Sequence, residues 1–222
     1  MSLEVLYEDN HIIAVYKPAG LLVQGDISGD ISLMDEVKKY IKEKYKKPGN
    51  VFLGLVHRLD RNVSGIVVFG KTSKGASRLS EQFRDDTIKK IYYAVVEGEI
   101  NPNKGRLIHF LKKDEEKRIA VSSDTQKEGY DESELDYEVI KTNKIFSLVK
   151  IILKTGRFHQ IRAQFSAIGH PIVGDKKYGG NNKMSDSSLA LCATEIEFRM
   201  ATTDEIKNIK IDYPKIWGDF LK

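Results

Sequence analysis

At residues 56–69 the chain reads Val-His-Arg-Leu-Asp-Arg-Asn-Val-Ser-Gly-Ile-Val-Val-Phe. A short polar loop is flanked by apolar residues here, and the run from Ile66 to Phe69 has the β-branched and aromatic content of a buried strand. Loops held between rigid elements often carry catalytic side chains. Asp60 is the one carboxylate of this loop, and the nearby Arg58 and Arg61 favour its charged form. Asp60 is therefore a candidate nucleophile or base.

A structural role for the same loop is equally open on spacing alone. Asp60 could accept backbone N–H bonds in a turn while the arginines pair with it. Ion pairs of this structural kind are as common as functional ones, so a catalytic role for the loop needs further evidence from other segments of the chain.

Length and composition describe a globular protein. The chain has 222 residues, of which 41% are hydrophobic and 31% charged, and it contains no repeat, low-complexity tract or Pro/Ser-rich linker, so we expect a single domain over residues 1–222. No apolar run approaches the roughly 18 residues of a membrane span, and no signal peptide is recognisable. One cysteine, Cys192, excludes an internal disulfide and a multi-cysteine metal site. A cytoplasmic protein without membrane attachment is expected.

The net charge of +4 and the pI near 8.9 support a nucleic-acid ligand only weakly. The distribution of the charge is more informative. Lysines at Lys89-Lys90 and Lys176-Lys177 are candidate phosphate contacts, whereas the lysines of residues 38–47 are expected on the solvated face of a helix.

Apolar periodicity predicts several strands and a few helices. One helix should begin at Ser32, with a near match to a capping box, and end before Pro48-Gly49. A second should be capped by Ser73, and a third should run to about Ile168. Strands are expected at residues 3–7, 12–16, 66–69, 88–98, 107–110, 118–121, 135–140, 145–153, 189–198 and 209–213, with an exposed loop at 127–134.

Two further segments carry polar residues at strand and helix ends. The strand at residues 88–98 contains Lys90-x-Tyr92-x-Ala94 and ends at a glycine. Residues 155–162 read Thr-Gly-Arg-Phe-His-Gln-Ile-Arg, where a strand ends and a helix begins. Without further information, a histidine such as His159 is more often structural than ligand-binding.

The three segments together, in this order, are similar to the motifs of the RluA family of RNA pseudouridine synthases. The motif His57-Arg58-Leu59-Asp60 resembles the catalytic motif of that family, and residues 169–179 extend the resemblance of the third segment. The resemblance implies the pseudouridine synthase fold, an α+β arrangement with a mixed, largely antiparallel sheet, flanking helices and a central active-site cleft. It also implies a catalytic domain that lacks the N-terminal S4 domain found in many family members. Val63 and Cys192 depart from the usual residues of the family.

The resemblance also implies roles for individual residues. Asp60 would be the catalytic carboxylate, and Arg162 would pair with it. Tyr92 would stack on the target base and is a candidate for removing its C5 proton; by spacing, Tyr93 is the competing choice. Arg58 would occupy the space left by the flipped base. Further candidate substrate contacts are His57, Arg157, His159, Gln160, Lys90, Lys176 and Lys177.

The implied reaction converts uridine to pseudouridine. It breaks the N1–C1′ bond, rotates the freed uracil and rejoins it through C5, so neither a cofactor nor a metal is expected. The expected partner is RNA, in the form of an rRNA or tRNA stem-loop, and a monomer without an obligatory protein partner is expected. Two alternatives remain: a carbohydrate hydrolase, which generally needs two carboxylates, and a non-catalytic RNA-binding module.

Overall fold

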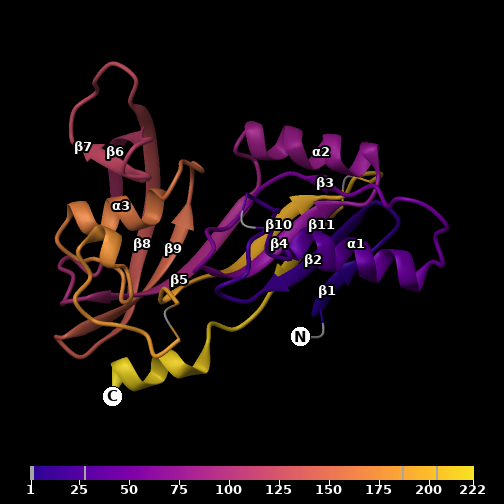
Figure 1. The fold of residues 1–222 in the computed structure, drawn as a ribbon. Helices are drawn as coiled ribbons and strands as arrows, with labels where there is room; N and C mark the ends of the chain where they lie inside the picture. Colours follow the sequence, from indigo (N-terminus) through magenta and orange to yellow (C-terminus); the bar gives the residue numbers. More distant parts are fainter. Residues whose placement is uncertain (1–2, 28, 187, 204) are drawn as a thin grey trace. The chain divides into compact units, whose positions relative to one another are not determined.

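The computed structural model describes residues 3–27, 29–186, 188–203 and 205–222 and divides into two compact units (Figure 1). Unit 1 comprises Met1–Ile88 and Glu195–Ile211, and unit 2 comprises Lys89–Thr194 and Asp212–Lys222. Each unit is built from two separate chain segments, whereas the sequence predicted one domain. In the part of the chain that is described, no helix is long and apolar enough to cross a membrane.

The sheet of unit 1 is built mainly from the N-terminal strands. β1 (Val5–Glu8), β2 (Ile12–Lys17) and β4 (Ser64–Gly70) are neighbours, and β3 (Gly54–Leu55) also pairs with β4. The last five residues of β10 (Leu191–Arg199) belong to this unit and pair with β11 (Ile206–Lys210). The pairings of β1 with β2, β2 with β4 and β10 with β11 are antiparallel. The predicted N-terminal hairpin is confirmed.

Two helices accompany this sheet, α1 (Leu33–Lys44) and α2 (Ser73–Arg84) (Figure 1). The capping box predicted at Ser32 is confirmed, because its side chain and that of Asp35 bond to each other's backbone N–H. The second cap was predicted one residue too late: the Oγ1 of Thr72 accepts the N–H of Gly75 at 3.1 Å. One apolar cluster of unit 1 draws on the sheet, on α2 and on residues 195–211; its buried members are Ile12, Ala14, Ile66, Val68, Leu79, Ile88, Ile196, Phe198, Ala201 and Ile209.

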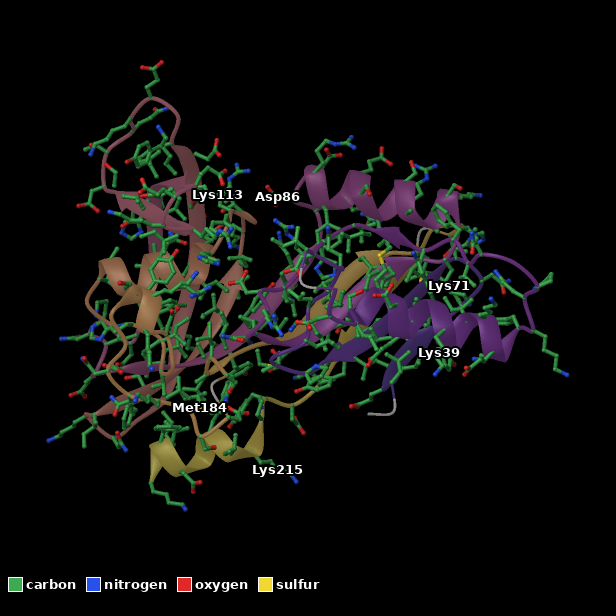
Figure 2. All side chains as sticks on the ribbon, viewed as in Figure 1. Lys39, Lys71, Asp86, Lys113, Met184 and Lys215 are labelled. Carbon is green, nitrogen blue, oxygen red and sulfur yellow. The ribbon has the colours of Figure 1, made fainter. Side chains whose placement is uncertain are left out.

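A buried carboxylate fastens α1 to the end of β1. The carboxylate of Glu8 accepts hydrogen bonds from Nζ of Lys44 at 2.6 Å and from Nζ of Lys71 at 2.5 Å. It also accepts hydrogen bonds from the hydroxyls of Tyr40 and Tyr45. Figure 2 labels Lys71, which directly follows β4. Burial raises the pKa of Glu8, but the hydrogen bonds from Lys44, Lys71, Tyr45 and Tyr40 outweigh this effect and lower it to about 2.

The strands of unit 2 form an antiparallel sheet in the order β5, β9, β8, β6, β7. Their bounds are Lys89–Glu97 for β5, Lys104–Asp114 for β6, Ile119–Ser123 for β7, Asp131–Thr142 for β8 and Phe146–Leu153 for β9. The predicted antiparallel pairing is confirmed, but the meander order was wrong, because β8 pairs with β6 and not with β7. The turn predicted at Asn143 closes through the N–H of Asn143 and the carbonyl of Phe146. The prediction of a loop at 127–134 was wrong for residues 131–134, which belong to β8. There Asp131 pairs with Leu111 of β6, so backbone pairing at the surface overrides the polar composition.

The helix α3 (Gln160–Ala167) is the element of unit 2 that carries the third motif. It is buried from Gln160 to Phe165, so both its polar and its apolar side chains face the protein. The short 3₁₀ turns η1 (Lys176–Tyr178) and η2 (Lys215–Leu221) complete the unit. Ala163 of α3 packs with Leu111, Ala120 and Tyr178 in a small apolar cluster.

Candidate active site

The loop that carries Asp60 lies in unit 1 and is held by a buried lysine. Lys17, at the end of β2, is 0% exposed, and its Nζ donates to the carbonyl oxygens of Pro18 at 3.0 Å, Leu21 at 2.8 Å and Arg61 at 2.9 Å. An ammonium has three N–H donors, so these three acceptors match its full capacity. Because Arg61 directly follows Asp60, this bond fixes the loop beside the predicted catalytic carboxylate.

The charges of Lys17 and Asp60 act on one another. Burial lowers the pKa of the Lys17 ammonium to about 8, the charge of Asp60 raises it, and the charge of Arg61 lowers it. Lys17 faces Gly65 in the register of β2 and β4, and Gly65 has a φ of +127°, a conformation that favours glycine. The polar loop thus leads into a buried strand through Gly65, whose backbone conformation only glycine adopts easily.

His57 also fastens the loop. Its Nε2 accepts the N–H of Val68 at 2.9 Å, which places the proton of a neutral ring on Nδ1. The ring stacks on Phe83 of α2, with centroids 4.6 Å apart. These contacts favour a structural role over the predicted substrate contact.

The two arginines of the loop differ in their surroundings. Arg58 is exposed, as its predicted contact with RNA requires. Arg61 instead bonds to the neighbouring β2–α1 loop, with Nε on the carbonyl of Gly20 and Nη2 on Asp30, both at 2.9 Å. Arg61 therefore forms an ion pair with Asp30.

The competing tyrosines of β5 are distinguished by their faces. Tyr92 and Tyr93 follow one another along the strand, so they point to opposite faces. Tyr93 packs on Tyr213 of the C-terminal segment, with centroids 5.2 Å apart, and Tyr213 in turn stacks on Trp217. This packing gives Tyr93 a structural environment and favours Tyr92 as the residue that meets the substrate.

Gln160 lies inside the protein. It is 3% exposed; its Oε1 accepts from the hydroxyl of Thr155 and the N–H of Arg157, and its Nε2 donates to the carbonyl of Glu134 and to Gln164. These four bonds fill the capacity of a side-chain amide. The structure thus favours an internal role for Gln160 rather than the predicted substrate contact.

The other two polar residues of this motif lie closer to the surface. Arg157 is exposed, and its Nε donates to the carbonyl of Glu132 at 3.2 Å. His159 has a φ of +52° just before α3; its Nδ1 lies 2.9 Å from the hydroxyl of Tyr178, and its ring stacks on Phe158 at 3.8 Å between centroids. Their predicted contacts with substrate stay predictions.

Arg162 is held by a carboxylate that the sequence did not single out. Its Nε donates to Oδ2 of Asp175 at 2.6 Å and its Nη2 to Oδ1 at 2.9 Å, while its Cζ lies over the ring of Tyr178, 4.9 Å from the ring centre. Arg162 is 7% exposed and Asp175 is 1% exposed. This is a bidentate, desolvated ion pair.

The four lysines proposed as phosphate contacts fall into two groups. Lys89, Lys176 and Lys177 are exposed, as such contacts require. Lys90 is 8% exposed, so it presents little of its surface to an outside ligand. The phosphate-contact prediction is therefore stronger for the first three.

Asp60 belongs to unit 1, whereas Tyr92 and Arg162 belong to unit 2. The predicted ion pair of Asp60 with Arg162 therefore stays a prediction. Lys17 and Asp175 are the residues that the sequence analysis missed. The signal for Lys17 was a lysine at the end of an apolar strand, and that for Asp175 was an acid between two glycine-containing turns.

Comparison with known proteins identifies the family. The model of the RNA pseudouridylate synthase family matches residues 11–167, which include Asp60, Tyr92 and Arg162. An uncharacterized RNA pseudouridine synthase of Bacillus subtilis is 30% identical over 220 residues, covering 96% of this chain and 69% of the relative. Ribosomal large subunit pseudouridine synthase C of Buchnera aphidicola is 35% identical over 186 residues, covering 82% of this chain and 56% of the relative.

The fold is shared as well. The solved structure of human RNA pseudouridylate synthase domain containing 4 superposes with a TM-score of 0.81, at 22% identity, over 98% of this chain and 91% of that chain. Several sequence relatives are longer, since the chain spans only 52% to 62% of some of them. The match of the family model over most of the chain, the sequence relatives and the shared α+β fold lead to one conclusion: the chain belongs to the RluA family of RNA pseudouridine synthases, which are isomerases.

Proposed function

We propose that this chain isomerises specific uridines of a structured RNA to pseudouridine, with Asp60 as the catalytic carboxylate. The observation that carries the proposal is the match of the family model across one continuous range that contains the Asp60 loop, Tyr92 and Arg162. The buried Lys17 beside the loop supports it, because catalytic groups need fixed positions and Lys17 bonds to the residue that follows Asp60.

The reaction needs one carboxylate at the sugar. Asp60 either adds to C1′ of the ribose or removes the C2′ proton, and in both cases the N1–C1′ bond breaks. The freed uracil rotates and C5 bonds to C1′, while the Asp60–C1′ bond breaks in the first route or the proton returns to C2′ in the second. The C5 proton must then be removed, and N1 must gain a proton, so that the product is an isomer of the substrate.

Tyr92 and Arg162 would assist this sequence. The phenol of Tyr92 has a π-face on which a base can stack and an oxygen that can take the C5 proton. Arg162 would hold Asp60 charged and oriented. A stacked base is out of reach, so the target must be flipped out of the RNA, at a cost of a few kcal/mol, and the exposed Arg58 would fill the space that it leaves.

The RNA and the state of the protein are the finer part of the proposal. Relatives named as ribosomal large subunit pseudouridine synthases support rRNA as the substrate, and a tRNA stem-loop is the other candidate. We expect a cytoplasmic enzyme that acts as a monomer. Light scattering of the purified protein, with and without RNA, measures the oligomeric state.

Asp60→Asn tests the catalytic assignment. The amide keeps the shape of the carboxylate but cannot act as nucleophile or base, so pseudouridine formation should be abolished while the fold and most of the RNA affinity remain. The measurement is the pseudouridine content of uridine-containing RNA after incubation with purified protein. Substantial product from the variant would reject the role of Asp60, and RNA binding without product from the unaltered chain would favour the non-catalytic alternative.

A further inference from the structure

The ion pair of Arg162 with Asp175 has features that a surface pair lacks. Both side chains are almost fully buried, and the two N–H···O bonds of 2.6 and 2.9 Å fix the guanidinium in its plane as well as in its position. A free arginine side chain populates many rotamers, and this bidentate pairing restricts that freedom before any substrate binds.

The segment that carries Asp175 is itself fixed. The N–H of Asp175 bonds to the carbonyl of Ile172, and its own carbonyl accepts the N–H groups of Tyr178 and Gly180. Gly174 has a φ of +91°, and a Cβ there would collide with the carbonyl oxygen of Ser188. The carboxylate of Asp175 therefore projects from a backbone that has little room to move.

This segment is also bonded to the strand that carries Tyr92. Val173 donates its N–H to the carbonyl of Val95 at 2.9 Å, and the N–H of Glu97 bonds to the carbonyl of Pro171 at 2.9 Å. Val95 and Glu97 lie on β5, a few residues after Tyr92. Asp175 thereby links Arg162 on α3 to the backbone of the strand that carries Tyr92, and all these contacts lie within unit 2.

We propose that Asp175 is a positioning residue of the isomerisation: its carboxylate holds the Nε and Nη2 atoms of Arg162 and thereby fixes the guanidinium for the role proposed for Arg162 above. The inference rests on the proposed function of this site. The position of Arg162 over the ring of Tyr178 supports it, because this cation–π contact restrains the guanidinium in addition to the two bonds to Asp175. Asp175 acts through Arg162 and does not touch the reacting atoms.

The first test replaces Asp175 with Asn, which removes the charge and one of the two acceptors. At saturating RNA, the single-turnover rate should fall about 10- to 100-fold, because a misplacement of about 1 Å can cost about a hundred-fold. The RNA dissociation constant should change by less than about three-fold, since Asp175 is buried. A rate within three-fold of that of the unaltered chain overturns the proposal.

Asp175→Glu distinguishes the effect of the position of the carboxylate from the effect of its charge. It also provides a second variant in case Asp175→Asn fails to fold. It keeps the carboxylate, but the extra methylene moves the acceptor against a backbone that cannot follow. A positioning role predicts a rate at least about ten-fold lower, whereas a purely electrostatic role predicts a rate close to that of the unaltered chain and would overturn the proposal.

A double-mutant cycle tests whether the effect runs through Arg162. In an Arg162→Lys background the bidentate fork is gone, so Asp175→Asn should lower the rate by less than three-fold. The same loss in both backgrounds would show that Asp175 acts by another route. Glu97→Gln is the matched control: its carboxylate also anchors a turn, through the N–H groups of Asn181 and Asn182, but does not touch Arg162. Its rate should stay near that of the unaltered chain.

One readout is independent of catalysis. The Nε–H of Arg162 should exchange slowly with solvent in the unaltered protein and quickly in Asp175→Asn, as measured by nitrogen-15 NMR. Equal exchange rates in both proteins would reject the proposal that Asp175 holds the Nε–H of Arg162, whether or not the chain is active. Absence of pseudouridine with every RNA tried, together with a protected Nε–H, would reject the proposed function and with it the catalytic purpose of the pair, while leaving the contact itself established.

Discussion

Replacing Lys17 with methionine would remove a buried ammonium and keep most of the side-chain volume. Three carbonyl oxygens would lose a donor, those of Pro18, Leu21 and Arg61. The carbonyl of Arg61 would keep its bond from the N–H of Gly20 at 2.8 Å. The main loss therefore falls on the carbonyls of Pro18 and Leu21, which flank the turn at Ala19 and Gly20.

The expected loss of stability follows from these two acceptors. Each of these part-buried carbonyls, left without a donor, costs about 1–3 kcal/mol, and part of the total is offset because an ammonium no longer has to be buried. A net loss of about 2–4 kcal/mol is expected on that basis. For a chain of this length, that corresponds to a decrease in Tm of about 5–15 °C.

Thermal unfolding at neutral pH, followed by calorimetry, measures this difference. The matched control is Lys39→Met, which replaces an exposed lysine of α1 (Figure 2) and should change stability by less than about 0.5 kcal/mol. The single-turnover rate of Lys17→Met should also fall below that of the control, since the bond to Arg61 fixes the loop next to Asp60. An unchanged Tm for Lys17→Met would refute the view that its three bonds hold the loop.

Three further predictions follow from the described contacts. The double variant Lys176→Ala/Lys177→Ala should weaken RNA binding and reduce the slope of log affinity against log salt by roughly 0.7–0.9 per lost phosphate contact; an unchanged slope would remove this pair from the interface. Tyr92→Phe should lower the rate severely and Tyr93→Phe only slightly, and the reverse order would exchange their roles. The pKa of Glu8 is lowered from 4.5 to about 2, so its contribution to stability is complete above pH 4.5 and is lost as the pH falls toward 2; the Tm difference between the unaltered chain and Glu8→Gln should therefore shrink across that window.

Local signals in the sequence predicted much of the fold correctly. The Ser32 capping box, the N-terminal hairpin and the turn at Asn143 each depend on neighbouring residues. The errors occurred where the surroundings decide between similar options. Thr72 and Ser73 can both cap a helix, and Asp131 joins β8 only because β6 offers a partner.

The candidate site likewise combines residues that the sequence predicted with a contact that it did not predict. Family resemblance led to Asp60, Tyr92 and Arg162 through their order along the chain, and the resemblance predicted contacts for Gln160 that its burial disfavours. The partnership of Arg162 with Asp175 was not predictable from spacing, because a turn after α3 brings the carboxylate back to the helix. Long-range pairings of this kind depend on tertiary structure and leave no periodic pattern in the sequence.

The construction of unit 1 from two distant segments has a consequence for biosynthesis. Four of the ten buried residues in the apolar cluster described above, Ile196, Phe198, Ala201 and Ile209, come from residues 195–211, which follow the first segment of unit 2 in the chain. During translation, residues 1–88 leave the ribosome with an incomplete core and an unpaired edge on β4, and they must wait until more than a hundred further residues have been made. The nascent N-terminal strands are thus an exposed apolar surface in the growing chain, where chaperones would bind and where premature termination would yield an aggregating fragment.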